Sequence, residues 1–389
     1  MKIVQINSFS NGSTGKIMMS IHNELLNQGI ESYVVWGRGR KSNNKNEIYM
    51  NDKIGVYFHA LYSRITGKTG FASKRATRKL IERLDEIEPD IIHLHNIHGY
   101  YINIKLLFDY IKKNNIKLIW TLHDCWAFTG HCAYFDYCNC EKWEKKCNKC
   151  PQLNEYPKSF IDNSKYNFER KKSIFTGIKN ITIITPSVWL LNLVKKSFLN
   201  NYEIKVINNG IDLDVFKPTK SNFRKKYNLE NKSIILGVAN VWDRRKGLED
   251  FIELSKVIKN DTKIIIIGLS NKQIKKLPSN IIGIHRTENQ RELIEIYSSA
   301  NIFFNPTRED NYPTVNLEAI ACGTPVVTYN TGGAPETVRD NGLIVTKEDF
   351  LSKYSEYIKK INNNFNNNIK EYSVYNMTKE YLKIYQKIQ

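Results

Sequence analysis

Short apolar runs alternate with longer, mostly polar stretches of helical spacing along almost the whole chain. Short apolar runs are typical of strands that are buried on both faces of a parallel sheet, and the stretches between them favour helices. The alternation therefore predicts an α/β protein. The strands that it predicts before residue 270 are 2–6, 32–36, 90–95, 117–122, 181–185, 233–238 and 263–268.

The residues after the first predicted strand are unusually polar. Residues 7–16 read NSFSNGSTGK and are predicted to form a loop in front of a helix that ends at Leu26. A phosphate-binding P-loop is excluded, because Lys16 is followed by Ile17 rather than by Ser or Thr. The glycines of this loop, Gly12 and Gly15, fit either a ligand-binding turn or an ordinary flexible one.

A strand-helix-strand unit near the C-terminal end contains the clearest ligand-binding pattern. Residues 305–336 read NPTREDNYPTVNLEAIACGTPVVTYNTGGAPE, between an apolar run at 302–304 and a second strand at 325–329. Pro313 is predicted to be the first helical residue, because proline has no N–H to leave unpaired there, and Gly323 ends the helix. The loop and the helix start should then lie at the carboxyl ends of the strands, where α/β sheets bind ligands.

Two features of this predicted helix indicate a ligand. The backbone N–H groups of Thr314 and Val315 would lie in its first turn, which favours an anion such as a phosphate. Glu318 stands among apolar neighbours, and a buried carboxylate needs hydrogen-bond donors. Ribose hydroxyls on a ligand would supply them; a Glu that caps a neighbouring loop is an equally open alternative.

The length and the charge of the chain limit the classes of protein to consider. A chain of 389 residues is too long for one core and predicts two domains. Lys and Arg exceed Asp and Glu by 58 − 39 = 19, so anionic partners are favoured: nucleic acid, anionic lipid or phosphorylated substrates. Neither a signal-peptide pattern nor an apolar run long enough to span a bilayer is recognised, which predicts a cytoplasmic protein.

A basic segment, 64–83, carries cations at helical spacing. They are Arg75, Arg78, Lys79 and Arg83, with an apolar stripe at Leu80, Leu84 and Ile87. The segment is either a solvated helix face or a contact with anionic lipid or with the diphosphate of an acceptor. The aromatic residues nearby would help such a contact; they are Tyr57, Phe58, Tyr62 and Phe71.

Histidines follow two of the predicted strands. The strand 90–95 ends in His95, with His98 beyond it, and the strand 117–122 is followed by His123 and Asp124. A single histidine at a strand end is usually a packed side chain, whereas two such ends favour a functional site. Asp124 could orient His123 or an acceptor.

Six of the seven cysteines lie between Cys125 and Cys150. Thiols stay reduced in the cytosol, so disulfides are not expected. The spacing Cys147-x-x-Cys150 is typical of zinc ligands, and Cys132 and Cys140 could complete four thiolates, with Cys138 as a competitor of Cys140. A loop without metal and a redox-sensitive cluster remain alternatives.

These motifs resemble a known enzyme family. An acid, seven residues and then Glu318 in front of A-x-A-C-G-T-P-V-V resembles the signature of retaining glycosyltransferases of family 4. The spacing places Asp310 and Glu318 at the two acid positions; the family more often has Glu at the first, and Glu309 stands one residue out of step. The stretches W-T-L-H-D, F-T-G-H-C and C-x-x-C-P resemble a subgroup from colanic-acid and capsule-type polysaccharide pathways.

The resemblance implies a GT-B fold, with two Rossmann-like α/β domains that face each other across a central cleft. Residues 1–200 would form the acceptor-side domain, which includes the cysteine loop 125–151. Residues 205–373 would form the nucleotide-sugar-binding domain, and a C-terminal helix, 374–389, would pack back on the first. The Asn-rich stretch 362–368 is expected to be a surface connection.

The resemblance also implies the activity and the residue roles. A sugar would move from a nucleotide diphosphate sugar, with retention at the anomeric carbon, to a saccharide acceptor that is lipid-linked. His123 and Asp310 would hold the sugar and Glu318 the ribose, whereas Lys246 would stabilise the diphosphate. The family's arginine position is Val241 here, so that role would pass to Arg245 or Arg244. The further donor-binding residues are Gly12, Gly15, Glu309, Thr314 and Val315.

No catalytic cofactor is implied, and zinc would be structural. The expected location is the cytoplasm, on the inner face of the cell membrane if the basic segment binds lipid. Two alternatives are a nucleic-acid-binding zinc protein, which explains the charge and the cysteines but not Glu318, and a nucleotide-sugar epimerase of the same fold. A hydrolase with two catalytic carboxylates is a weaker choice, because Glu318 lies inside its helix.

Overall fold

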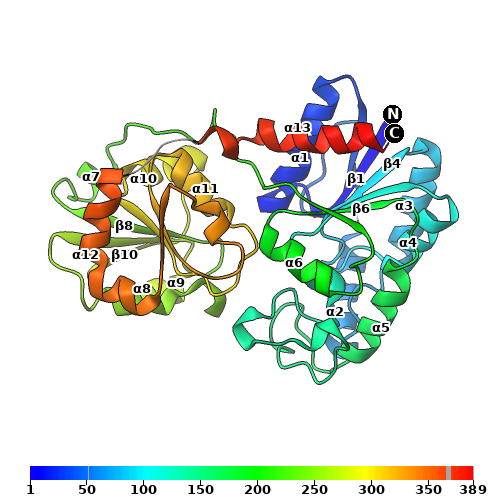
Figure 1. Cartoon of the computed structure of the whole chain (residues 1–389), viewed down its shortest axis with the longest axis horizontal. Coiled ribbons are helices and arrows are strands. Elements are labelled where there is room, and N and C mark those ends of the chain that lie inside the picture. The colour runs from blue at the N-terminus through cyan, green and yellow to red at the C-terminus, as the bar shows by residue number, and fades with distance from the viewer. Residues whose placement is uncertain (51, 365–368, 389) are drawn as a thin grey trace. The chain divides into compact units, whose positions relative to one another are not determined.

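The computed structural model describes residues 1–50, 52–364 and 369–388 (Figure 1). The chain divides into two compact units: unit 1 comprises Met1–Asn208 and Met377–Gln389, and unit 2 comprises Asn209–Asn376. Each unit has a parallel sheet and helices, so the predicted α/β class is confirmed. No helix of the described residues is both long and apolar enough to cross a membrane.

Unit 1 contains a seven-stranded parallel sheet in the order β3-β2-β1-β4-β5-β6-β7. Its strands are β1 (Lys2–Phe9), β2 (Glu31–Arg38), β3 (Glu47–Tyr49), β4 (Ile91–Leu94), β5 (Lys117–Thr121), β6 (Ile181–Thr185) and β7 (Glu203–Val206). Its helices are α1 (Gly12–Asn27), α2 (Lys53–Thr66), α3 (Lys74–Ile87), α4 (Ile104–Lys113), α5 (Ser164–Phe175) and α6 (Val188–Lys196). The strand order reverses between β1 and β4, where doubly wound sheets bind ligands.

Unit 2 contains a six-stranded parallel sheet in the order β10-β9-β8-β11-β12-β13, which reverses between β8 and β11. Its strands are β8 (Ser233–Val238), β9 (Thr262–Ile267), β10 (Ile281–Ile284), β11 (Ile302–Asn305), β12 (Val326–Tyr329) and β13 (Gly342–Val345). Its helices are α7 (Phe223–Lys226), α8 (Leu248–Leu254), α9 (Asn271–Ile274), α10 (Gln290–Ser299), α11 (Thr314–Ala321) and α12 (Lys347–Asn364).

Both faces of the sheet of unit 2 are buried, which explains its continuous apolar runs. Successive residues of a strand enter different cores: Leu236 packs in one hydrophobic cluster and Ile235 in another, and Phe303 and Phe304 divide in the same way. This arrangement follows from the alternation of side chains along a strand. The strands therefore read as uniformly apolar rather than alternating.

The last helix, α13 (Val374–Lys387), contributes its residues from Met377 onwards to unit 1. The hydroxyl groups of Tyr385 and Tyr381 hydrogen-bond His93 and Thr121, at 2.6 and 2.9 Å. Figure 1 shows this red helix beside the blue elements of unit 1, which are the first in the chain.

The structure corrects two local predictions. The polar stretch 7–16 is not one loop, because β1 extends through Phe9 and α1 begins at Gly12. Pro313 is not the first helical residue: it caps α11 with an extended backbone (ψ 112°), and the helix begins at Thr314. Gly323 follows the helix with φ +83°, as predicted. The Asn-rich stretch 362–368 lies partly outside the described residues.

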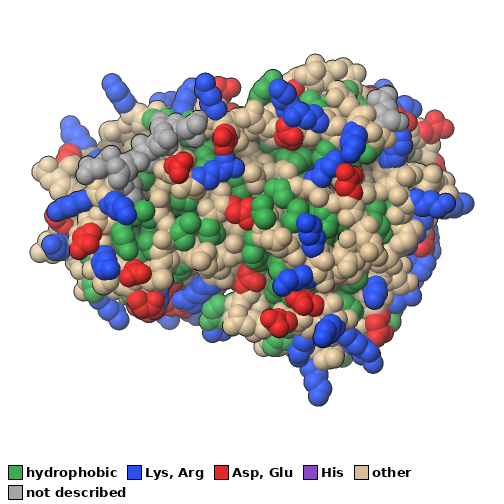
Figure 2. Space-filling view, viewed as in Figure 1, with side chains coloured by type: hydrophobic (Ala, Val, Ile, Leu, Met, Phe, Trp, Pro, Cys, Tyr) green, Lys and Arg blue, Asp and Glu red, His purple; other side chains and the backbone are tan. Residues whose placement is uncertain are grey.

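Basic side chains are spread over both units on the face that Figure 2 shows. Figure 2 shows Lys and Arg side chains over both units in this view, interspersed with fewer acidic ones, as the excess of 58 − 39 = 19 requires.

Candidate functional site

In unit 2, the loops after β8 and β11 meet at the point where the strand order reverses. Gly247 has φ +73°, and a Cβ atom there would lie 2.3 Å from the carbonyl oxygen of Pro306, so only glycine fits this approach. The Arg308 N–H donates to the carbonyl of Arg245 at 2.8 Å, and the Arg245 side chain donates to the carbonyl of Glu309 at 2.9 Å. Backbone contacts thus join the two loops.

This junction brings three of the predicted catalytic residues together. The Lys246 ammonium donates to Oδ2 of Asp310 at 2.6 Å, and the Arg245 guanidinium lies 4.0 Å from the same oxygen. The Asp310 carbonyl accepts from the Gly333 N–H at 3.0 Å, and a Cβ on Gly332 would lie 2.1 Å from that carbonyl oxygen. The predicted glycine turn therefore holds the acidic loop in place, and two cations gather around one mostly buried carboxylate.

Helix α11 begins next to this cluster in the chain. Asn316, in its first turn, accepts from the Asn305 side chain at 2.8 Å and donates to Thr337 at 2.7 Å, so the helix start is fastened to the end of β11. Thr314 and Val315 are half-buried in the same turn.

Glu318 is half-buried rather than buried, and its carboxylate accepts a hydrogen bond from the Tyr297 hydroxyl at 3.1 Å. Tyr297 lies on α10, is fully buried, and has its pKa raised by burial and by the adjacent carboxylate. Tyr297 thus gives the Glu318 carboxylate a hydrogen-bond donor within the protein, without a ligand and without a neighbouring loop to cap. Sequence analysis missed Tyr297, which belongs to no recognised motif.

The two other predicted donor-binding residues of this region differ in exposure. Glu309 is buried, and its carbonyl also accepts from the Thr307 hydroxyl at 3.1 Å. Arg244 is exposed, whereas Arg245 and Lys246 are half-buried. The guanidinium of Arg245, one of the two arginines considered in place of Val241, lies at this cluster.

In unit 1, three histidine rings lie side by side: His93 is on β4, His95 is just after β4, and His123 is just after β5. Nδ1 of His95 lies 3.0 Å from Nε2 of His123, and Nε2 of His95 lies 3.2 Å from the Gln5 side-chain oxygen. His93 hydrogen-bonds Thr121 at 2.8 Å. Burial lowers the pKa of His93 to about 3 and that of His123 to about 4, so both rings are neutral near pH 7. His123 is therefore a hydrogen-bonding group and not a cation.

Asp124 was considered above as a residue that orients His123 or an acceptor; that role stays a prediction, and in the structure Asp124 contacts His98. Its carboxylate bonds Nε2 of His98 at 2.8 Å, and Nδ1 of His98 bonds the Tyr156 hydroxyl at 2.9 Å. Burial alone would raise the pKa of Asp124, but His98 and the Trp126 N–H hold it below its ordinary value. A small cavity is lined by this pair together with His95, His123 and Trp126. The contact with Tyr156 was missed, because nothing local in the sequence links it to His98.

The two predicted glycines of unit 1 belong to α1. A Cβ atom on Gly15 would lie 2.5 Å from the backbone of Ser10, so this glycine permits tight packing of α1 on the end of β1. Gly12 has φ +72° and open space around the position of a Cβ atom. Gly15 thus has a structural role whatever it binds.

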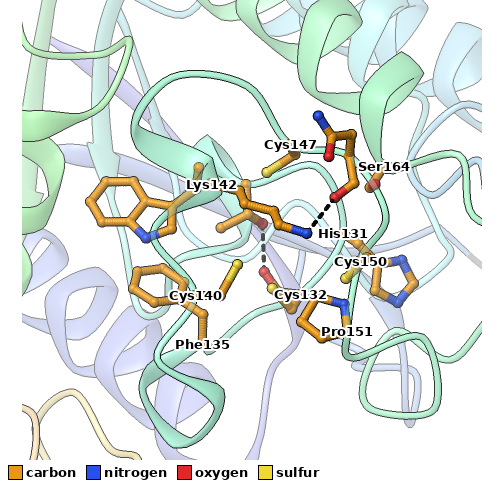
Figure 3. Close-up of a pocket in the computed structure, with 12 residues that line it drawn as sticks. His131, Cys132, Phe135, Cys140, Lys142, Cys147, Cys150, Pro151 and Ser164 are labelled. Atoms are coloured by element: carbon orange, nitrogen blue, oxygen red, sulfur yellow. Dashed lines mark hydrogen bonds between the residues drawn. The ribbon is translucent and has the colours of Figure 1, made fainter.

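The cysteine segment, 125–151, folds around a second cavity (Figure 3). The four predicted ligands line this cavity: Cys132, Cys140, Cys147 and Cys150. The Thr129 hydroxyl donates to the Cys132 carbonyl at 2.5 Å, and the Lys142 ammonium donates to the Asn148 carbonyl at 3.2 Å. Burial raises the pKa of the Cys147 thiol to about 11. Within the described ranges, no three His, Cys, Asp or Glu side chains are arranged as metal ligands.

Cys138 has different neighbours. Its sulfur donates to the Phe135 carbonyl at 3.3 Å and accepts from the Gln152 amide at 2.9 Å, and it does not line the cavity. The geometry thus favours Cys140 over Cys138 as a companion of the other three.

Lys171, on α5, is fully buried beneath the cysteine segment. Its ammonium donates to the carbonyls of Trp126 at 2.7 Å and Thr129 at 3.1 Å and lies 3.4 Å from the centre of the Trp126 indole. No carboxylate of the described residues lies within ion-pair distance of it, and burial lowers its pKa to about 7. Sequence analysis missed this lysine, since a lysine in a polar helix usually faces solvent.

Comparisons with known proteins support one family across both units. The family described as "Glycosyltransferase Family 4" matches residues 14–215, and the family described as "Glycosyl transferases group 1" matches residues 219–374. A relative from Escherichia coli (strain K12), named "Putative colanic acid biosynthesis glycosyl transferase WcaC", is 26% identical over 369 residues, which cover 90% of this chain and 89% of the relative.

Solved structures show the same fold. Sucrose-phosphate synthase from Thermosynechococcus elongatus aligns with a TM-score of 0.71 at 16% identity and covers 100% of this chain and 99% of its own. Anabaena Alr3699/HepE, in complex with UDP and glucose, aligns with a TM-score of 0.68 at 13% identity over 100% of both chains. The expected GT-B class is confirmed by these likenesses together with the two parallel sheets.

Proposed function

The chain belongs to Glycosyltransferase Family 4, whose match covers residues 14–215, more than half of the chain, and from this membership we propose that it builds a polysaccharide. The donor is a nucleotide diphosphate sugar, the sugar is transferred with retention, and the acceptor is a lipid-linked saccharide. The name of the relative from Escherichia coli supports the pathway, and the neighbour solved with UDP and glucose supports the class of donor.

The cluster of Lys246, Arg245 and Asp310 carries the proposal for the donor. A nucleoside diphosphate leaves with growing negative charge, and preorganised cations stabilise that charge most in the transition state. Lys246 and Arg245 are held by Asp310 and by backbone contacts next to the start of α11, whose dipole favours the same anion. Stabilisation of the leaving group is what retention requires most, so these residues are assigned to the chemical step.

Two further assignments complete the donor site in unit 2. The Glu318 carboxylate accepts hydrogen bonds from ribose hydroxyls. The buried Tyr297 hydroxyl positions that carboxylate by donating a hydrogen bond to it. Asp310 contacts the sugar through the oxygen that Lys246 does not hold most closely. In unit 1, neutral His123 contacts sugar hydroxyls by hydrogen bonding. None of these roles needs a catalytic metal.

Thermal stabilisation by nucleotides tests the donor. We expect one nucleoside diphosphate among UDP, GDP and ADP to raise the Tm of the wild type, and Glu318→Gln to reduce that shift, because an amide accepts ribose hydroxyls less well than a carboxylate. Glu356→Gln, on the exposed surface of α12, is the matched control and should retain the full shift. If no nucleoside diphosphate stabilises the wild type while duplex DNA does, the donor proposal is wrong.

The second part of the proposal is a structural zinc ion in the cysteine segment. Four thiols line one cavity, which is the donor set of closed structural zinc sites. Four thiolates around Zn²⁺ carry a net charge of about −2 by simple formal addition, and a buried charge of that size requires counter-charge nearby. Lys171 is buried nearby and supplies that counter-charge when protonated; its electrostatic neighbours are Cys147, Cys132 and Asp124. The metal would fasten the segment and take no part in transfer.

Metal analysis tests the zinc ion. Purified protein should contain about one zinc per chain, as a single closed site implies. Cys147→Ser should lose the metal, whereas Cys138→Ser, at the thiol outside the cavity, should keep it. Metal-free wild type with an unchanged Tm would contradict the proposal, and an intact thiol count would exclude a disulfide as the explanation.

The third part is peripheral association with an anionic membrane, which a lipid-linked acceptor would require. The predicted cations of the basic segment support it. Arg75, Arg78 and Lys79 are exposed on α3, whose buried side carries Leu80, Leu84 and Ile87. Arg83 forms an ion pair with Glu86 and contributes less net charge.

A further inference from the structure

Helix α2 exposes its apolar side chains instead of burying them. Tyr57 is 77% exposed, Ile54 72% and Phe58 67%, and Leu61, Tyr62 and Ile65 are exposed as well. These positions recur at i, i+3, i+4, i+7, i+8 and i+11, which is the spacing of one helix face. Such a face normally packs on a core, and a contiguous exposed one marks an interaction surface.

The opposite side of α2 is fastened to unit 1 by polar contacts. The buried residues of the helix are His59 and Ser63. His59 hydrogen-bonds the Ser73 hydroxyl at 2.8 Å and accepts from the Gly70 N–H at 3.3 Å. The helix is thus inverted relative to an ordinary amphipathic helix: its polar side is docked, and its apolar side faces solvent.

A neighbouring loop extends the apolar face. Phe160 is 70% exposed, and Ile161 is exposed beside it. The Phe160 N–H donates to the carbonyl of Arg64 at 2.8 Å, so this loop lies against the C-terminal end of α2. The Arg64 guanidinium lies 5.7 Å from the centre of the Phe160 ring. A cation therefore borders the apolar surface at this end.

The charge around the surface selects its occupant. Residues 53–81 contain no Asp or Glu, and their basic residues are Lys53, Arg64, Lys68, Lys74, Arg75, Arg78 and Lys79. A second copy of this chain would present the same cations and repel the first. An anionic lipid surface offers the complementary charge for these side chains and an acyl boundary for the apolar ones.

We propose that α2, with Phe160 and Ile161, inserts its apolar face into the headgroup–acyl boundary of an anionic bilayer. This proposal rests on the proposed function in one respect: a lipid-linked acceptor is the reason why the protein would need to bind a membrane. Insertion of α2 differs from electrostatic attraction of α3 to the membrane surface. Binding by insertion depends on the apolar area that is buried, so it persists when salt screens the charges.

Vesicle sedimentation separates the two contributions. The probe is vesicles of phosphatidylcholine with phosphatidylglycerol. The triple variant Tyr57→Ser, Phe58→Ser, Leu61→Ser should bind at least about tenfold more weakly at both low and high salt, because three large apolar groups no longer partition. The matched variant Arg75→Gln, Arg78→Gln, Lys79→Gln, on exposed positions of α3, should lose binding chiefly at low salt.

Insertion itself has a spectroscopic signature. The fluorescence of Phe58→Trp should be quenched by brominated acyl chains more strongly than the native tryptophans of the wild type are. Equal vesicle binding by wild type and the α2 variant would overturn the proposal. So would a dimer of the wild type that the α2 variant abolishes, because a second copy would then be the occupant.

The same variants separate this proposal from the donor proposal. Stabilisation by a nucleoside diphosphate should be equal in wild type and in the α2 variant, because α2 has no assigned role in donor binding. Loss of vesicle binding with intact nucleotide stabilisation supports insertion. Vesicle binding that depends on α2, in a protein that no nucleoside diphosphate stabilises, would contradict the donor proposal and leave insertion standing.

Discussion

The two units have the same kind of sheet and place contrasting chemistry at its carboxyl edge. In unit 2, the residues gathered after β8 and β11 are charged: Lys246, Arg245 and Asp310. In unit 1, the residues gathered at the ends of β4 and β5 include neutral imidazoles, such as His95 and His123, buried beside Trp126. One fold thus supports an ionic site and a largely neutral hydrogen-bonding site.

The difference follows from what each site is proposed to bind. A diphosphate needs fixed positive charge, and that charge must be held by a carboxylate while the site is empty of ligand. Sugar hydroxyls need hydrogen-bond donors and acceptors but no fixed positive charge, and buried histidines supply both once desolvation has removed their charge. Three histidines line the cavity in unit 1: His95, His98 and His123.

Removal of a cation from unit 2 should have the largest effect. Lys246→Ala should lower kcat by about 10²- to 10³-fold, because the charge acts on the departing diphosphate. KM for the donor should change less. Lys256→Ala, at an exposed position of the same unit, is the control for a lost lysine. If Lys246→Ala had the kcat of the wild type, the charge of Lys246 would not act in the chemical step, and unit 2 would not contain the proposed ionic catalytic site.

The second-largest expected effect is a loss of stability of unit 1 at acidic pH. Burial lowers the pKa of His93 to about 3, and that of His59 and His123 to about 4. The unfolded chain, with His pKa values near 6.5, therefore binds more protons than the folded one, so stability falls as the pH drops from about 6.5 towards 4.

Tryptophan fluorescence measures this loss in unit 1, which contains five of the six tryptophans. The Tm should fall between pH 7 and pH 5, and His59→Gln, away from the proposed sugar-binding residues, should reduce the fall. An equal pH dependence in His59→Gln and wild type would mean that the buried imidazoles do not control acid stability.

Removal of a single hydroxyl group in unit 2, that of Tyr297, should have the smallest effect of the three changes. Tyr297→Phe removes the donor to Glu318 and should raise the donor KM by about three- to tenfold, since hydrogen bonds to charged groups contribute about 1.5–3 kcal/mol at most. The kcat should stay near the wild-type value, as expected for a positioning residue.

Tyr312→Phe is the matched control for that variant. Its buried hydroxyl has no hydrogen-bond partner in the described structure, so its removal should be neutral or slightly stabilising. A rise in KM for Tyr312→Phe equal to that for Tyr297→Phe would show that general packing, and not the hydrogen bond to Glu318, sets donor affinity.

The parts of the molecule that sequence analysis predicted are those in which local pattern determines structure. Strands 181–185 and 233–238 were predicted with the bounds that β6 and β8 have, because buried parallel strands are continuous apolar runs. Asp310 and Lys246, 64 residues apart, were placed in one site through a family motif, and they form an ion pair. Their roles remain predictions.

The parts that were missed depend on contacts between distant segments. The hydrogen bonds of His98 with Asp124 and Tyr156 join residues that lie 26 and 58 positions away. The sequence around Lys171 predicts a solvent-facing lysine, and only the fold shows that the cysteine segment covers it. Glu318 was predicted to be buried, because the pattern of its helix could not show how much of that face stays open.

The helix α13 has a consequence for how the protein is made. Its Tyr385 hydroxyl reaches His93, 292 positions earlier in the chain, in the centre of unit 1. During synthesis from the N-terminus, unit 2 is therefore complete while unit 1 still lacks its last helix. Unit 1 can therefore reach its complete structure only after the whole of unit 2, which ends at Asn376, has been synthesised.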